Sequence, residues 1–236
     1  SWLTQIGKLV NGQPALLSCC LSNEPVYGAS GRDKYSAPAW HQFLRAHHKS
    51  LDALNALYGT KFASFDAVPA DGWKNDSAGQ RWAFDWVTFN NQHFAAWHKW
   101  MGELLKKDNP DLLTHAKIMV FFSLDPDKAG WGIDPECFAD ATDLAGCDAY
   151  AQLIAGVGPL DESASKEYAY HWQVEEMFYD LLNSFRNQPV FNSENHPMEN
   201  ACGPYPFPAI HTQAVIWQGA LHHQCGNERG LKQEHD

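Results

Sequence analysis

The chain has 236 residues, of which 44% are hydrophobic and 13% aromatic, and its formal net charge is −11 at pH 7. This apolar content can form a substantial core and argues against a disordered chain. The acidic balance argues against a nucleic-acid partner, because such surfaces need clustered Lys and Arg. No apolar run approaches the roughly 18 to 20 residues that cross a bilayer, so we expect no membrane partner.

Short apolar runs alternate with longer helical runs along the chain, which is typical of βα units and a parallel sheet. The chain starts in a helix-like segment, and Ala15–Leu21 is the first predicted strand. The first helix follows it, and we expect Ser50 and Gly59 to cap a short second helix. A stripe of aromatic and apolar residues then predicts a long helix. The stripe of the first helix comprises Trp40, Phe43, Leu44 and His47. The stripe of the long helix comprises Trp82, Trp86, Phe89, His93, Trp97, Trp100 and Leu104.

The second half of the chain repeats the same alternation. Predicted strands are His115–Phe122, Leu144–Tyr150 and Pro189–Ser193, each followed by polar or turn residues. The helical stripe between the last two comprises Tyr170, Val174, Met177, Phe178, Leu181 and Phe185. We expect all of these stripes to face the core. There is no internal repeat and no linker, so residues 1–236 are treated as one domain.

Two glutamates follow predicted strands directly: Glu24 after the first and Glu194 after the fourth. In a parallel barrel such residues point into one shared mouth, although they are 170 positions apart. Glycoside hydrolysis uses two facing carboxyl groups, one protonated and one ionised. A single glutamate in a loop is more often a solvated carboxylate, but the repeated placement favours a catalytic pair.

A family resemblance supports this interpretation. Asn23-Glu24-Pro25 after an apolar strand resembles the acid/base motif that closes the fourth strand of the clan A glycoside hydrolases. Glu194 lies where that clan has its nucleophile, at the end of the seventh strand. The stretch from Tyr35 to Pro69, with FLRAHHKSLDALNALYGTKFASFDAVP, is similar to the helices that follow the motif in the family 42 beta-galactosidase group, and this run is more specific than the two glutamates.

The resemblance implies an α/β fold of the (β/α)8 TIM-barrel type, with only about strands four to seven present. Little sequence after residue 223 predicts an eighth strand, so we expect a partial barrel catalytic domain that is a fragment of a longer chain. The implied reaction is hydrolysis of beta-linked O-glycosides with retention. Glu24 would be the general acid/base and Glu194 the nucleophile, while Asn23 would bind the sugar 2-hydroxyl and Tyr150 would orient Glu194.

The substrate is expected to be a carbohydrate, with beta-galactosides first and other beta-linked sugars left open. Trp131 and Tyr205 are candidates for stacking on sugar rings, although packing explains each equally well. No cofactor or metal is expected, because the zinc-binding cysteine cluster of some family 42 members is absent. The partners left open are the remainder of the barrel and further copies of the chain; localisation is undetermined. The alternative is a non-catalytic carbohydrate-binding or scaffold protein derived from such a barrel.

Overall fold

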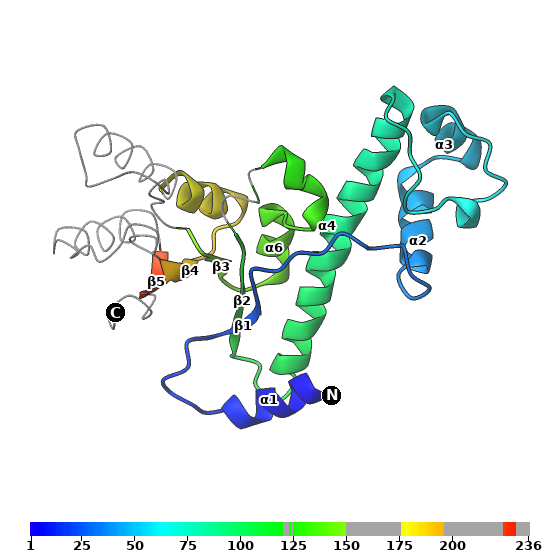
Figure 1. The fold of residues 1–236 in the computed structure, drawn as a ribbon. Coiled ribbons are helices and arrows are strands. Elements are labelled where there is room, and N and C mark those ends of the chain that lie inside the picture. The colour runs from blue at the N-terminus through cyan, green and yellow to red at the C-terminus, as the bar shows by residue number, and fades with distance from the viewer. Residues whose placement is uncertain (120–122, 124, 150–175, 196–223, 230–236) are drawn as a thin grey trace, which may run out of the picture.

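The structure is a computed structural model that describes residues 1–119, 123, 125–149, 176–195 and 224–229. Its strands form two parallel sheets, in which β1 pairs with β2, and β3 pairs with β4, which pairs with β5. A parallel bridge between Ile118 and Cys147 joins the two sheets, so the five strands follow one another in chain order (Figure 1). The strands are β1 Ser18–Asn23, β2 Leu113–Lys117, β3 Ala145–Cys147, β4 Val190–Asn195 and β5 Gln224–Arg229.

The four predicted strands are present with shifted bounds, but the expected strand count was wrong. β5 lies parallel to β4 in the region where the sequence predicted no further strand. The segment reads QCGNER, which has neither an apolar run nor alternation. Its strand conformation depends on pairing with β4, and such tertiary context is invisible to a pattern of local hydrophobicity.

Helices cover the connections between the strands. They are α1 Trp2–Val10, α2 Ala37–His47, α3 Leu51–Tyr58, α4 Ser77–Lys106 and α6 Pro135–Ala141, with the 3-10 helices η1 Phe65–Ala67 and η2 Pro126–Trp131 and a further helical segment at 176–185. The predicted caps of α3 are confirmed. The Ser50 side chain accepts a hydrogen bond from the Ala53 N–H, and Gly59 ends the helix in the left-handed conformation.

The long helix α4 extends from α2 and α3 past α6 (Figure 1), and its residues contribute to two separate cores. Its first half packs with α2 and α3, burying Trp82, Trp86 and Phe89. Its second half contributes Phe94 to the core formed with the strands, and Figure 1 shows α6 beside it. A single apolar stripe therefore cannot be buried along the whole helix, because each half packs against different elements.

The expected stripe on α4 is consequently wrong beyond its middle. Trp97 and Trp100 are about half exposed, at 50% and 49%, while the buried positions shift to His98, Met101 and Leu105. The stripe before β4 is also only partly right. Its residues Phe178 and Leu181 pack in or against the core, whereas Met177 and Phe185 are exposed, and Tyr179 and Leu182 are buried instead. Tyr170 and Val174 lie outside the described residues.

A buried histidine, His115, lies on β2. His115 is 3% exposed, and its Nδ1 hydrogen-bonds the Ser18 hydroxyl at 2.8 Å. Within the described part of the chain its Nε2 has no hydrogen-bond partner. Burial lowers the pKa of His115 from 6.5 to about 4, because the charged imidazolium loses solvation. The folded protein therefore holds this ring neutral.

We predict that His115 makes the protein less stable in mild acid. Between pH 6.5 and pH 4 the unfolded chain binds a proton that the folded chain does not, so the free energy of unfolding falls as pH falls. From pH 7 to pH 5 this single group should remove about 2 kcal/mol, and His115→Leu should remove that part of the dependence. Urea unfolding at the two pH values measures it.

Ser18→Ala is the matched control for that measurement. It deletes the hydrogen bond to Nδ1 but keeps the imidazole, so the pH dependence should persist. Burial also lowers the pKa of His93 and His98, and these two rings account for dependence that remains in His115→Leu. An unchanged pH dependence in His115→Leu would contradict the prediction.

Candidate active site

Glu24 follows β1 in an unusual backbone conformation. Its φ is 47°, and it is the only non-glycine residue with positive φ in the described part of the chain. A residue held in the left-handed region is strained by roughly 1 to 3 kcal/mol, and such strain tends to occur at functional sites. The Glu24 N–H donates to the Lys117 carbonyl oxygen at 2.9 Å, which ties this turn to the end of β2. The preceding residue, Asn23, is exposed and lies opposite Lys117 in the sheet.

Lys117 is the last residue of β2, and its side chain is only 3% exposed. Its Nζ lies 3.5 Å from Glu24 Oε1 and also forms an ion pair with Glu194 Oε2. The two glutamates thus contact the same ammonium group, although Glu24 follows β1 and Glu194 lies near the end of β4, 170 positions later in the sequence. The carboxylates themselves are 41% and 32% exposed for Glu24 and Glu194, so they can meet a ligand from solvent.

Asn192 supports Glu194 from inside β4. Its side chain is fully buried, and its Oδ1 accepts a hydrogen bond from the Glu194 N–H at 3.2 Å. Its Nδ2 donates to the Ala149 carbonyl and to the Tyr179 hydroxyl, the latter at 2.6 Å. The amide therefore joins β4 to Ala149, two residues beyond β3, and to the helix at 176–185, which fixes the backbone that carries Glu194.

The other predicted site residues are not brought to these carboxylates by the described contacts. Tyr150 and Tyr205 lie outside the described residues. Trp131 ends η2, where it is partly buried against the core. Its carbonyl accepts from the Tyr27 N–H at 2.7 Å, and Lys128 Nζ lies 4.5 Å from its ring centroid. These are packing contacts, and a role in sugar binding stays a prediction.

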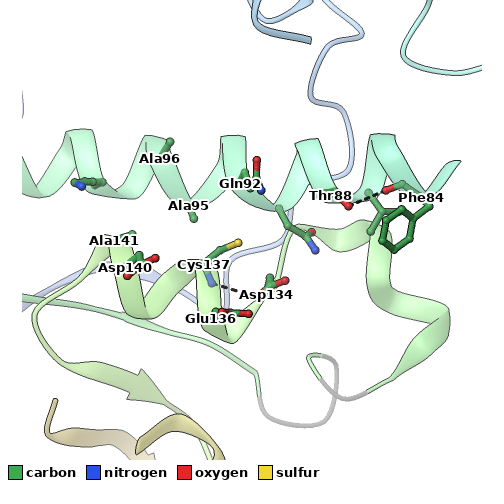
Figure 2. A pocket seen from close by; sticks show the side chains of 13 residues that line it. Phe84, Thr88, Gln92, Ala95, Ala96, Asp134, Glu136, Cys137, Asp140 and Ala141 are labelled. Atoms are coloured by element: carbon green, nitrogen blue, oxygen red, sulfur yellow. Dashed lines mark hydrogen bonds between the residues drawn. The ribbon is translucent and has the colours of Figure 1, made fainter. Parts of the chain in front are cut away.

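A separate groove lies between α4 and α6 (Figure 2). It has a volume of about 710 Å³ and none of Glu24, Lys117 and Glu194 lines it. The Cys137 thiol in this groove is a poor nucleophile, because burial and then the nearby charges of Asp134 and Glu136 raise its pKa to about 12. The residues that line it are Phe84, Val87, Thr88, Asn91, Gln92, Ala95, Ala96, Lys99, Asp134, Glu136, Cys137, Asp140 and Ala141.

The described residues hold neither a metal-binding cluster nor a membrane-spanning helix. No group of three or more His, Cys, Asp or Glu side chains there is arranged to hold a metal ion. None of the helices described combines the length and apolar character that spanning a bilayer requires.

The family model of glycoside hydrolase family 42, described as beta-galactosidase, matches residues 1–217. The chain belongs to glycoside hydrolase family 42. No curated protein matches the chain.

Solved structures of this family share the fold. An exo-carrageenase of family 42 from Bacteroides ovatus is 22% identical, with a TM-score of 0.66 over 88% of this chain and 30% of that one. The beta-galactosidase from Rahnella sp. R3 is 18% identical, with a TM-score of 0.69 over 96% and 32%. The beta-galactosidase from Halorubrum lacusprofundi is 15% identical, with a TM-score of 0.72 over 99% and 36%. The chain thus spans about a third of the length of these structures.

The sequence of this family 42 chain did not single out Lys117. It lies within HAKIMVFF, whose apolar residues predict a strand but give no role to the charge of the lysine. The available signal was a lysine within the run expected to be a buried parallel strand, because a buried charge requires partners. Those partners, two carboxylates from other strand ends, are visible only in the structure.

We predict that Asn192 is essential for the rigidity of the Glu194 side of the site. Asn192→Ala removes a fully buried amide and leaves the Glu194 N–H and the Ala149 carbonyl without that partner. The free energy of unfolding should fall by about 2 to 4 kcal/mol. Asn187→Ala, at an exposed position shortly before β4, is the control and should change it by less than about 0.5 kcal/mol. Equal stability of the two variants in urea unfolding would contradict this assignment.

Proposed function

We propose that this chain supplies the catalytic pair of a retaining glycosidase that hydrolyses beta-linked O-glycosides. Glu24 acts as the general acid/base and Glu194 as the nucleophile. The observation that carries the proposal is the contact of both carboxylates with one buried ammonium group at the ends of parallel strands. In a family 42 chain, two glutamates placed in this way have the chemistry that glycoside hydrolysis needs.

The proximity of the carboxylates favours retention over inversion. A retaining pair lies about 5 to 5.5 Å apart, whereas an inverting pair leaves about 6.5 to 9.5 Å for a water molecule. Two carboxylates that contact the same Nζ lie near each other, which supports the closer spacing of a retaining pair. This arrangement suits a nucleophile that touches the anomeric carbon directly.

The reaction proceeds in two displacements. Glu194 attacks the anomeric carbon while Glu24 gives its proton to the leaving oxygen, forming a glycosyl ester on Glu194. Glu24 then takes a proton from water, the water oxygen attacks the anomeric carbon, and Glu194 leaves as a carboxylate. Asn23, exposed at the end of β1, would bind the sugar 2-hydroxyl. A hydrogen bond from Tyr150 to Glu194 stays a prediction.

The substrate proposed first is a beta-galactoside, as the description of the family suggests. The similar structures include both beta-galactosidases and an exo-carrageenase, so carrageenan fragments belong in the same test. Since the chain spans about a third of those structures, activity is measured on the full natural protein. That further strands close the barrel around this chain stays a prediction.

Variants of the two glutamates test the proposal with aryl beta-glycosides. Glu24→Ala should lower turnover about 10²- to 10⁴-fold on substrates with poor leaving groups, because it lacks the proton donor. It should still form the glycosyl intermediate from activated substrates, and azide should release a beta-glycosyl azide. Glu194→Ala should form no intermediate at all.

Glu136→Ala is the matched carboxylate control. Glu136 is exposed on α6 in the separate groove, so its removal should leave turnover unchanged. Normal turnover in Glu194→Ala would overturn the assignment. A wild-type protein that binds sugars without hydrolysing any of the panel would favour the alternative of a non-catalytic carbohydrate-binding protein.

A further inference from the structure

We propose that Lys117 is a positioning residue. Its ammonium group stabilises the single negative charge of the catalytic pair, first on Glu194 and then on Glu24 as the reaction proceeds. The inference rests on the proposed function, because it assigns a role relative to those two glutamates. It starts from the position of Nζ, which contacts both carboxylates while its own side chain is 3% exposed.

The cluster consists of one ammonium and two carboxyl groups. A buried ammonium is stable only when a negative charge accompanies it, and the proposed reaction starts with one carboxyl group protonated and the other ionised. In that state the cluster carries one positive and one negative charge. This is the charge state that a retaining glycosidase needs before the first step.

The ammonium contacts the two carboxyl groups unequally. Nζ forms its closer ion pair with Glu194, whereas it lies 3.5 Å from Glu24. The nearer carboxylate gains more from the positive charge, because Coulomb energy falls with distance. Glu194 is therefore the carboxylate that the ammonium stabilises more strongly before the first step, as a nucleophile requires, and Glu24 is the partner that acts as the acid.

In the first displacement the negative charge that Lys117 stabilises moves from Glu194 to Glu24. Glu194 becomes a neutral ester when it bonds to the anomeric carbon, and Glu24 becomes negative when its proton leaves with the alcohol. Nζ lies close enough to Glu24 to pair with it without any movement of the backbone. The ammonium thereby stabilises Glu24 as the base that deprotonates water. The total charge of the cluster is the same in both states.

The backbone of Lys117 also holds Glu24 close to the ammonium group. Its carbonyl accepts the Glu24 N–H, so one residue fixes the strained turn and supplies the ammonium. Other titratable groups on the elements packed here include His115 on the same strand, His98 on α4 and Asp148 after β3. His98 contacts the Ser22 hydroxyl and His115 contacts Ser18. Among these described groups, Glu24 and Glu194 are the carboxylates that pair with Nζ.

The pH dependence of kcat/KM tests the proposal in the full natural protein. Lys117→Met keeps the length of the side chain but removes its charge, so both glutamates should bind protons more readily. The acid limb of the profile should move to higher pH by at least about one unit, because the nucleophile ionises later. Lys117→Arg retains a positive charge and should return the limb to within about half a unit of the wild-type position.

Turnover of an activated aryl glycoside gives a second readout. Lys117→Met should slow both formation and hydrolysis of the glycosyl intermediate by about tenfold or more, since the cation serves both steps. Lys99→Met, an exposed lysine on α4 in the separate groove, is the control and should leave rates and profile unchanged. If Lys117→Met fails to fold, Lys117→Gln replaces it in the same measurements.

The outcomes separate this inference from the proposed function. Wild-type activity that depends on Glu24 and Glu194, together with an unshifted acid limb in the uncharged variants, would overturn the role of Lys117 and leave the proposed function standing. Loss of activity without a shift of the limb would assign Lys117 a merely structural role and also overturn the inference. A wild-type protein without hydrolytic activity would overturn the proposed function itself.

Discussion

Burial of the Lys117 ammonium is the constraint on which the arrangement of this site depends. A cation removed from water is strongly destabilising unless opposite charge lies beside it. Nζ finds that charge on Glu24 after β1 and on Glu194 at the end of β4. The ends of three strands must therefore meet at one point. A parallel sheet achieves this, because the carboxyl ends of all its strands lie along the same edge.

Each carboxylate is held there by a different device. Glu24 occupies a left-handed backbone conformation that its N–H bond to the Lys117 carbonyl maintains. Glu194 depends on Asn192, whose amide joins β4 to the neighbouring elements from a fully buried position. Strain on one side and a buried polar network on the other both require a rigid scaffold. The core formed by the strands, α6 and the second half of α4 provides it.

Local sequence predicted the parts of this structure that local forces determine. Glu24 and Glu194 stand out because each follows an apolar strand, and Ser50 and Gly59 stand out because helix caps have residue preferences of their own. The stripe on α4 was right only to Phe89, because the second half of the helix turns to another core.

Features that depend on distant partners were missed. Pairing with β4 makes β5 a strand, although its sequence shows no strand pattern. Lys117 pairs with carboxylates that are far from it in sequence, so no local pattern reveals its contacts. The match of the family model to residues 1–217 supports the predicted family, while the roles of the individual residues are proposals.

The most direct test of this account is the arrangement of the three charged groups in a crystal structure of the full natural protein. The account predicts a separation of about 5 to 5.5 Å between the Glu24 and Glu194 carboxyl groups, with Lys117 Nζ in contact with both. Carboxyl groups more than about 10 Å apart would be incompatible with direct attack on a shared sugar and would contradict it. A Lys117 side chain directed away from both glutamates would contradict it equally.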